Sequence, residues 1–453
     1  MIFERIESPG LAHFSYLIGD RNEALVIDPR RDCDIYVERT LRRGVRLRLI
    51  LETHRNEDYL TGSVELARRT GAEIWHADGH LAYEYGLAVE DGQEFFVGGL
   101  RLKAIWSPGH TAGAMSYLLY DPEGVPWMVF TGDTLLAGSV GRVDLFGGEA
   151  MANLAESLHE TIFAKLLPLG DGVIVCPAHG SGSACATGTA QRSWTTIGIE
   201  RRSNPRLQHT ERGEFVRDVS RMLPRPPYFR QMEIRNLEGA LLPNELPTPP
   251  PLPPAEFREM SGEAQVLDTR PLEGFGGGHV PGSLSLSLES LSEYGGWFLN
   301  YNLPVLLVTD PEDVSEPVRR LIRLGYDHIG GYLAGGMQAW HAQGEISRAT
   351  TTMTAHDLCR RLDDGMALHV LDVRGQEELD REGRLARAQH IPLTQIPELW
   401  KSIPRDGRIA IFCGSGRRAM IAASYLEQRG LQDLIVVLGG VSAWQSTSCP
   451  IEI

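Results

Sequence analysis

Short apolar runs alternate with polar, helix-compatible stretches along the whole chain. In the first half, residues 24–27, 47–51 and 127–130 are largely apolar runs with the length of buried strands, and turns or helical segments separate them. In the second half, the runs at residues 305–308 and 409–412 are each followed by a helix-compatible stretch. This alternation predicts an α/β fold in both halves of the chain.

The clearest boundary is a proline-rich segment at residues 243–254. Seven of its residues are proline, and proline interrupts helices and favours an extended chain. We therefore expect one domain at residues 1–242 and an extended linker at residues 243–254.

Two copies of one domain follow this linker. The segment Leu-Asp-Thr-Arg that begins at Leu267 recurs 104 residues later as Leu-Asp-Val-Arg from Leu371, and the same offset carries Trp340 onto Trp444. In each copy an apolar run ends in Asp-x-Arg and a second apolar run leads into a helix, which predicts an α/β domain around a parallel sheet. The expected copies are residues 255–350 and 353–453.

Composition and charge narrow the function. A chain of 453 residues exceeds what one hydrophobic core usually supports, and its 42% hydrophobic and 23% charged residues are ordinary for a folded protein. The net charge of -15 at pH 7 argues against a nucleic-acid partner, which would favour a basic surface. We expect a small-molecule substrate.

The sequence contains no recognisable targeting or membrane segment. It begins Met-Ile-Phe-Glu-Arg-Ile-Glu, which differs from a signal peptide, and no apolar stretch reaches the ~18 residues of a membrane span. A cytoplasmic protein without a membrane partner is expected. The six cysteines have no paired spacing, which predicts reduced thiols. They are Cys33, Cys176, Cys185, Cys359, Cys413 and Cys449.

One of these cysteines opens the loop that follows the apolar run at residues 409–412. The loop reads Cys413-Gly414-Ser415-Gly416-Arg417-Arg418, and a helix-compatible stretch follows it. The glycines let backbone N–H groups turn inward, and a helix N-terminus adds partial positive charge. With two arginines beside it, Cys413 is expected to be a thiolate nucleophile that also carries a persulfide anion.

The first copy lacks this nucleophile. The offset of 104 residues places Thr309 opposite Cys413 and Asp313 opposite Arg417. Acidic residues and Pro311 would repel an anion and remove a backbone donor. We expect one sulfur-carrying site in the two copies, and a structural or docking role for the first.

The second copy resembles the rhodanese family of sulfurtransferases over residues 353–453. Its loop matches the family pattern Cys-x-x-Gly-x-Arg at Cys413, Gly416 and Arg418. The residues that also match are Asp372, Arg374, Gly439, Gly440 and Trp444. The resemblance implies that Cys413, Arg417 and Arg418 are catalytic, and that residues 255–350 form an inactive rhodanese-like domain.

Several short polar motifs in residues 1–242 follow predicted strands. They contribute His54, Asp58, His110, Asp133 and His179. Loops at the ends of strands can converge at one edge of a sheet, where such side chains bind metals. Taken together, they predict a metal site.

This set resembles the metallo-β-lactamase superfamily, particularly its glyoxalase II and persulfide dioxygenase branch. Dinuclear members have the motif Thr-His-x-His-x-Asp-His, whereas here Asn56 and Tyr59 replace its second and third histidines. The resemblance implies an αββα sandwich and a single metal held by His54, His110 and Asp133. Two histidines and one carboxylate with open positions suit non-haem Fe(II), so one Fe(II) per chain is the expected cofactor.

Further residues are assigned to the surroundings of the metal or to the substrate. Arg142 and Asp144 match another family segment and are expected to orient the ligands. Arg206 is interpreted either as a contact to an anionic thiol or as part of a structural ion pair, and Cys185 either as a second reactive thiol or as an ordinary cysteine. The full set is Asp58, Tyr59, Arg142, Asp144, His179, Cys185 and Arg206.

The whole chain resembles persulfide dioxygenase–sulfurtransferase fusions of bacterial sulfide detoxification. The resemblance implies that a low-molecular-weight thiol persulfide is oxidised by O2 to sulfite, and that Cys413 passes a sulfane sulfur to sulfite to form thiosulfate. Two alternatives stay open, a glyoxalase II-like thioester hydrolase with an appended sulfurtransferase and a non-catalytic sulfur-relay or sensing scaffold with a degraded metal site. The sequence also leaves open the thiol carrier and homo-oligomer formation.

Overall fold

A computed structural model describes the chain except for residues 184, 186–187, 193, 243–245, 311–313 and 453. The chain divides into two units, Met1–Leu246 with Ile322–Gly325, and Pro247–Leu321 with Tyr326–Ile453. None of the helices in the described part of the chain is both long and apolar enough to cross a membrane.

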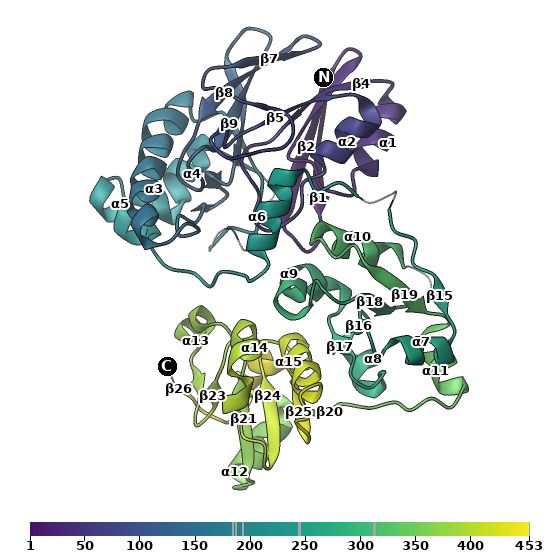
Figure 1. The fold of residues 1–453 in the computed structure, drawn as a ribbon. Helices are drawn as coiled ribbons and strands as arrows, with labels where there is room; N and C mark the ends of the chain where they lie inside the picture. Colours follow the sequence, from purple (N-terminus) through teal and green to yellow (C-terminus); the bar gives the residue numbers. More distant parts are fainter. Residues whose placement is uncertain (184, 186–187, 193, 243–245, 311–313, 453) are drawn as a thin grey trace. The chain divides into compact units, whose positions relative to one another are not determined.

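The N-terminal region contains two six-stranded sheets (Figure 1). The first has the order β1-β2-β3-β4-β5-β6, with antiparallel pairs up to β3 and parallel pairs beyond it. The second has the order β14-β13-β10-β9-β8-β7, in which β10 and β13 are parallel. The strands of the first sheet are β1 (Ile2–Ser8), β2 (His13–Asp20), β3 (Glu23–Ile27), β4 (Arg46–Leu51), β5 (Glu73–His76) and β6 (Leu87–Ala88). Those of the second are β7 (Glu94–Val97), β8 (Leu100–Trp106), β9 (Met115–Tyr120), β10 (Pro126–Gly132), β13 (Ile174–Pro177) and β14 (Thr195–Thr196), and β11 (Leu135–Leu136) pairs with β12 (Ser139–Val140).

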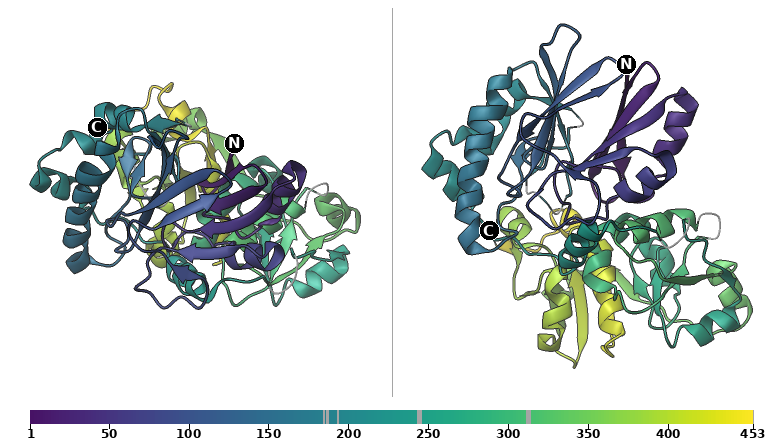
Figure 2. Two further views of the ribbon diagram at one scale, coloured as in Figure 1. Left: turned by 90° about the horizontal axis from the view of Figure 1, so that it is seen from above. Right: turned by 45° about the horizontal axis from the view of Figure 1, so that its top comes forward.

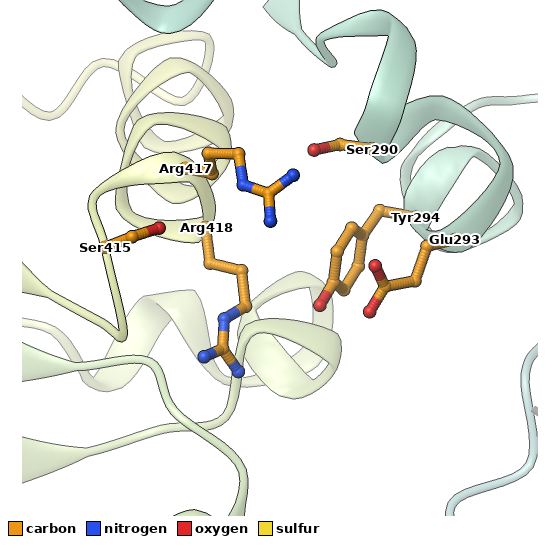
Figure 3. Close-up of a pocket in the computed structure, with 6 residues that line it drawn as sticks. All are labelled: Ser290, Glu293, Tyr294, Ser415, Arg417 and Arg418. Atoms are coloured by element: carbon orange, nitrogen blue, oxygen red, sulfur yellow. The ribbon is translucent and has the colours of Figure 1, made fainter. Parts of the chain in front are cut away.

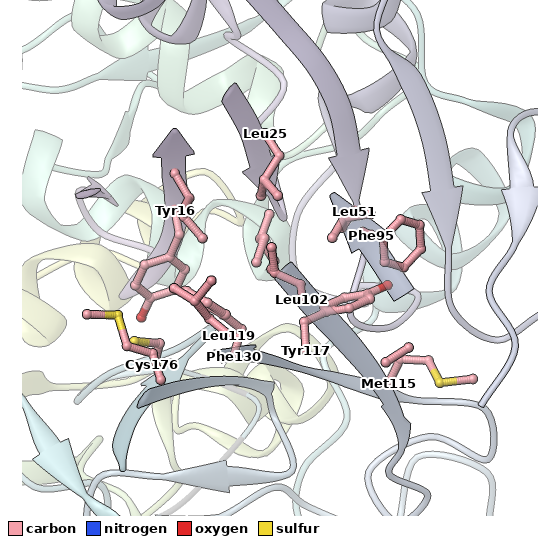
Figure 4. Close-up of a cluster of buried hydrophobic side chains, with 14 of the residues drawn as sticks. Tyr16, Leu25, Leu51, Phe95, Leu102, Met115, Tyr117, Leu119, Phe130 and Cys176 are labelled. Atoms are coloured by element: carbon pink, nitrogen blue, oxygen red, sulfur yellow. The ribbon is translucent and has the colours of Figure 1, made fainter. Parts of the chain in front are cut away.

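The side chains of each sheet alternate between two apolar layers. On β2, Tyr16 and Ile18 face the core between the sheets, whereas Leu17 faces the helices outside, because successive strand residues point to opposite faces. Figure 4 shows Tyr16 of the first sheet in the same core as Phe130 of the second.

Helices cover both outer faces, with α1 and α2 on the first sheet and α3 on the second (Figure 2). The arrangement is the expected αββα sandwich of the metallo-β-lactamase fold. The helical elements are α1 (Asp34–Arg43), α2 (Ser63–Thr70), α3 (Gly148–Glu160), η1 (Thr161–Leu166), η2 (Leu167–Leu169), α4 (Ile197–Ser203), η3 (Pro205–Gln208), α5 (Arg212–Val219) and α6 (Phe229–Glu238).

The proline-rich segment differs from a simple spacer. Its residues Pro251–Leu252 form β15, which pairs with β19, and α7 begins at Pro254. Proline is favourable in the first turn of a helix because its fixed φ suits that turn and its missing N–H has no partner there. The expectation that this segment excludes helix is therefore wrong at its last residue, and residues 243–245 lie outside the described part.

The two repeats have parallel sheets of the same strand order. The orders are β15-β19-β18-β16-β17 and β20-β25-β24-β21-β23. Asp268 is opposite Val308 in the first sheet, and Asp372 is opposite Phe412 in the second, so the offset of 104 residues holds for the register too. The strands are β15 (Pro251–Leu252), β16 (Gln265–Asp268), β17 (Leu284–Ser285), β18 (Val305–Val308) and β19 (Ile329–Leu333), then β20 (Thr351–Thr354), β21 (Leu368–Asp372), β23 (Gln389–His390), β24 (Arg408–Phe412) and β25 (Leu434–Leu438).

Equivalent tryptophans anchor the two cores. Trp340 packs edge-on against Phe257, with ring centroids 6.2 Å apart, and Trp444 packs edge-on against Phe412 at 5.7 Å. The helical elements of the first repeat are α7 (Pro254–Met260), α8 (Leu272–Gly277), α9 (Leu288–Phe298), α10 (Ser315–Arg323) and α11 (Gly336–Ala342). Those of the second are α12 (Ala355–Asp363), α13 (Gln376–Glu382), η4 (Leu393–Gln395), α14 (Ile396–Leu399), η5 (Trp400–Ser402), α15 (Arg417–Glu427) and α16 (Gly440–Trp444), and β22 (Arg384–Leu385) pairs with β26 (Ile451–Glu452).

The expectation of six reduced cysteines is wrong. Cys359 of α12 and Cys449 near the C-terminus form a disulfide, although 90 residues separate them in the sequence. They meet because β20 pairs with β25, which brings α12 against α16 just before Cys449. Spacing along the chain gives no sign of such a pair. The remaining cysteines, Cys33, Cys176, Cys185 and Cys413, are free and buried.

Candidate metal centre and sulfur-transfer loop

The ends of several strands bring the predicted metal ligands together. His54 follows β4, His110 lies between β8 and β9, and Asp133 follows β10 directly. His179 follows β13, which is parallel to β10, so Asp133 and His179 emerge at the same sheet edge. All four side chains are buried.

His54, His110 and Asp133 form one group. Asp133 Oδ2 lies 3.8 Å from His54 Nε2 and 3.7 Å from His110 Nε2. Ligand atoms that share one metal ion at ~2.1 Å lie roughly 3 to 3.4 Å apart, so a small closure is enough for all three to bind it. His54 Nε2 is buried and has no hydrogen-bond partner among the described residues. The three side chains therefore fit one metal ion.

Hydrogen bonds orient both imidazole rings toward this point. Thr53 donates its hydroxyl proton to Asp28 Oδ2 at 2.8 Å, so Thr53 Oγ1 accepts from His54 Nδ1 at 2.9 Å. His110 Nδ1 donates to the backbone carbonyl of Arg142 at 2.9 Å. These bonds at Nδ1 turn both Nε2 atoms toward the metal position. Burial lowers the pKa of His54 to about 3, so this ring is neutral.

Glu57 is a member of the site that sequence reasoning missed. Its side chain is buried, and its Oε2 lies 3.4 Å from His110 Nε2. One potential ligand atom each of His54, Glu57 and His110 lie within 4.8 Å of one another. Burial lowers the pKa of His110, but hydrogen bonding to Glu57 and the charges of Glu57 and Asp133 outweigh it and raise that pKa to about 9. A metal that binds His110 Nε2 must therefore displace a proton from this nitrogen. The only signal in the sequence was a carboxylate between His54 and Asp58.

A second group lies on the other side of Asp133. His179 Nδ1 is 2.7 Å from Asp133 Oδ1, and His179 Nε2 is 3.1 Å from Asp58 Oδ2. Cys185 is buried and offers a sulfur within 4.8 Å of ligand atoms of Asp58 and His179. Burial, together with the charge of Asp58, raises the pKa of the Cys185 thiol well above its ordinary value, so this thiol is protonated.

Tyr59 occupies the position of the third histidine in the dinuclear motif. Its ring centroid lies 4.1 Å from that of His13 and 6.2 Å from that of His179. The phenol oxygen is buried without a hydrogen-bond partner in the described part of the chain. Tyr59 thus places a phenol where the dinuclear members of the family have a metal-binding histidine.

The remaining predicted residues differ in their roles. Arg142 forms two hydrogen bonds to Asp144, at 2.7 and 2.8 Å, and this buried pair fixes the backbone carbonyl that receives His110 Nδ1. Arg206 forms an ion pair with Asp218 at 2.6 Å. Of the two interpretations of Arg206, this contact agrees with the structural ion pair.

The Cys413 loop links β24 to α15. Cys413 is buried, and the Gly416 N–H donates to its Sγ at 3.1 Å. The Val441 N–H donates to the Cys413 carbonyl at 3.0 Å. A Cβ at Gly440 would lie 2.1 Å from that carbonyl, and Gly440 has a φ of +46°, so only glycine lets α16 approach the loop this closely.

The two arginines of the loop have carboxylate partners that the sequence did not indicate. Arg418 donates to both oxygens of Glu378, at 2.5 and 2.6 Å. Arg417 is exposed and donates to Glu289 of the first repeat at 2.6 Å. Arg418 also interacts electrostatically with Cys413. Glu378 therefore holds the Arg418 cation at the start of α15, directly after the Cys413 loop.

The first repeat has no cysteine at the equivalent position. Thr309 follows β18 directly, as Cys413 follows β24. Pro311 and Asp313, which the sequence places in this loop, lie outside the described residues. His279 is buried, and its Nε2 lies 3.4 Å from Glu427 of α15, so it joins the two repeats.

Comparison with known proteins agrees with this architecture. The metallo-beta-lactamase superfamily matches residues 8–179, and the rhodanese-like domain matches residues 253–343 and 354–447. The mitochondrial persulfide dioxygenase ETHE1 of Bos taurus is 31% identical over 246 residues, which are 50% of this chain and 84% of that protein. The hydroxyacylglutathione hydrolase GloC of Haemophilus influenzae is 28% identical over 214 residues, which are 43% of this chain and 91% of that protein.

A solved structure extends the similarity beyond the N-terminal region. The crystal structure of a metallo-beta-lactamase from Staphylococcus aureus has a TM-score of 0.66 at 27% identity, and the match covers 74% of this chain and 99% of that chain. These matches define a metallo-β-lactamase-fold enzyme with two rhodanese-like domains. The chain belongs to the family that includes the ETHE1 persulfide dioxygenases.

Proposed function

We propose that this enzyme oxidises low-molecular-weight thiol persulfides with O2 at a mononuclear iron site, and that Cys413 transfers sulfane sulfur to sulfite. The observation that carries the proposal is the presence, on one chain, of the buried group His54, His110 and Asp133 and of a cysteine whose Sγ accepts a backbone hydrogen bond in the loop before α15. Relatives that are named persulfide dioxygenases support it.

The first site would hold one iron through His54, His110 and Asp133. Iron(II) in such a two-histidine, one-carboxylate site supplies redox chemistry with O2 and open coordination positions. Thr53 and the Arg142 carbonyl orient the two rings through their Nδ1 atoms, and burial of the group excludes bulk water. The overall reaction balances when one persulfide, one O2 and one water give one thiol, one sulfite and two protons.

The second site would work by nucleophilic transfer. The Cys413 thiolate attacks the outer sulfur of a thiol persulfide, the bond between the two sulfurs breaks, and the thiol leaves with the electron pair. Cys413 then carries the outer sulfur as a persulfide. The Gly416 N–H and the Arg418 cation stabilise the sulfur anion in both states.

The remaining expectations complete the proposal. Residues 1–242 form the dioxygenase domain, residues 255–350 the inactive rhodanese-like domain and residues 353–453 the sulfurtransferase. The proline-rich segment at residues 243–254 joins the first two and contributes β15 and the first residue of α7 to the inactive domain. The protein acts in the cytoplasm, its partners are the thiol persulfide, O2 and sulfite, and each chain binds one Fe(II).

Two variants test the division of labour. In His110→Ala, O2 consumption with glutathione persulfide should disappear, because the site loses a ligand. In Cys413→Ser, O2 consumption should continue, and sulfite should accumulate instead of thiosulfate. Identical product profiles for the two variants would contradict two separate sites.

The hydrolase alternative has support of its own, because a hydroxyacylglutathione hydrolase matches 43% of this chain. Metal analysis of the purified protein, combined with an assay of glutathione thioester hydrolysis, separates the two functions. Iron with O2 uptake and no thioester turnover supports the dioxygenase, and rapid thioester turnover contradicts it. A protein that binds no metal would indicate the non-catalytic scaffold.

A further inference from the structure

A pocket of about 290 Å³ lies between the Cys413 loop and α9 of the first repeat. Figure 3 shows side chains of both repeats that point into it. Its lining residues are Ser290, Glu293 and Tyr294 on α9 and Ser415, Arg417 and Arg418 on the loop and α15. The repeat without a cysteine therefore forms one wall of a pocket beside the repeat that has one.

Direct contacts hold this wall in place. The Ser285 N–H donates to Ser424 Oγ at 3.0 Å, and the Gln428 side chain donates to the Gly282 carbonyl at 2.9 Å. Both hydrogen bonds join the first repeat to α15, since Ser424 lies in this helix and Gln428 follows it directly. Because α15 begins at the Cys413 loop, these bonds fix the first repeat relative to the loop.

The pocket is lined mainly by hydrogen-bond donors. In Figure 3 the phenol oxygen of Tyr294 points toward the guanidinium of Arg418, and Arg418 interacts electrostatically with both Tyr294 and Cys413. Burial and the neighbouring Glu293 carboxylate raise the pKa of Tyr294 well above its ordinary value, so its phenol keeps the proton and is a donor at neutral pH. Guanidinium, phenol and serine hydroxyl groups together suit a small oxyanion.

The Glu293 carboxylate, in contrast to these donors, disfavours an anion in the pocket. It is exposed at the same pocket, and the Tyr294 phenol is hydrogen-bonded to it. An incoming oxyanion must displace this carboxylate from the phenol and also meets its negative charge.

We infer that the first repeat supplies the acceptor subsite for Cys413, in which Tyr294 donates a hydrogen bond to the oxyanion of sulfite and Glu293 weakens its binding. This inference rests on the proposed sulfur transfer to sulfite and adds residues that select the acceptor. The sulfite sulfur attacks the outer sulfur of the Cys413 persulfide with its lone pair. The bond to Cys413 Sγ breaks, its electron pair stays on Sγ as a thiolate, and thiosulfate leaves.

The test uses full-length protein without O2, so that the first site cannot consume the persulfide. Cys413 is loaded with glutathione persulfide, excess reagent is removed, and single-turnover discharge is followed with either sulfite or cyanide, a small acceptor without oxygen atoms. Tyr294→Phe should raise the half-saturating concentration of sulfite about tenfold, as expected for loss of one hydrogen bond to a charged group. Discharge to cyanide should change less than twofold.

Two further variants make the result specific. Glu293→Gln should lower the half-saturating concentration of sulfite, which is opposite in sign to Tyr294→Phe. Tyr332→Phe, which removes a phenol from β19 of the same repeat outside the pocket, should match the wild type. The inference is overturned if Tyr294→Phe also matches the wild type, or if it slows discharge to sulfite and to cyanide equally. If Cys413→Ser still transfers sulfur, the proposed function fails instead.

Discussion

Glu57 Oε2 lies 3.4 Å from His110 Nε2, closer than the 3.7 Å between Asp133 Oδ2 and the same nitrogen. The carboxylate nearest to His110 is therefore one that the family motif does not name. Together with Asp133, it gives the two histidines two buried carboxylates, a combination that attracts a divalent cation.

The first prediction concerns this carboxylate. Glu57→Ala should lower the affinity for Fe(II) about tenfold or more, because neighbours of metal ligands contribute this much even when they do not bind the metal directly. Competition with a chelator of known affinity measures the change. Glu73→Ala on β5, which removes an exposed carboxylate, is the matched control. Equal affinities of the two variants would show that Glu57 has no part in the metal site.

The second prediction concerns the support of His110. Asp144→Asn should destabilise the fold by about 3 kcal/mol, because it leaves the buried Arg142 cation without its ion-pair partner. It should also weaken metal binding, since the Arg142 carbonyl orients His110. Asp171→Asn is the control, because Asp171 forms an exposed pair with Arg201 and such pairs contribute less than about 1 kcal/mol. Denaturant unfolding and metal titration measure the two effects, and similar values for both variants would contradict the prediction.

The third prediction is a dependence on pH at Glu378. Burial alone would raise the pKa of Glu378, but its hydrogen bonds to Arg418 and the Arg418 charge hold that pKa below the ordinary value. A lowered folded-state pKa stabilises the fold above the ordinary glutamate pKa of about 4.3, and this stabilisation is lost as the pH falls through the lowered value.

Glu378→Gln should therefore be less stable than the wild type by about 1 kcal/mol at neutral pH, and the difference should shrink in acid. Unfolding curves of both proteins from pH 7 downward measure it. A difference that stays constant with pH would mean that the charge of Glu378 does not contribute.

The fourth prediction concerns the disulfide between Cys359 and Cys449. Thiol titration of the denatured, unreduced protein should find only Cys33, Cys176, Cys185 and Cys413. Cys449→Ser should lower stability by about 2 to 5 kcal/mol, as for removal of a native disulfide. Dithiothreitol should lower the melting temperature of the wild type and leave that of Cys449→Ser unchanged. Titration of all six thiols would show that the pair is reduced.

The sequence alone was enough to locate the strand ends that carry the chemistry. His54, Asp133 and Cys413 each follow an apolar run closely, and a polar residue after a buried strand must lie at the edge of the sheet where the chain turns. The offset of 104 residues between the two repeats can also be read from the sequence, and it predicted Thr309 at the position where a second nucleophile would lie. The family resemblance added which of these residues share a site.

Only the tertiary structure decided which distant residues complete each site. Glu57 points at His110, Glu378 holds Arg418, and Cys359 meets Cys449, through the packing of segments far apart in the sequence. Tyr294 reaches the Cys413 pocket because α9 belongs to the other repeat and packs beside its loop. Periodicity and motif spacing describe how a segment folds, but the order of strands and the packing of helices determine what faces it. The sequence therefore identified the reactive residues, and the fold determined which side chains surround them.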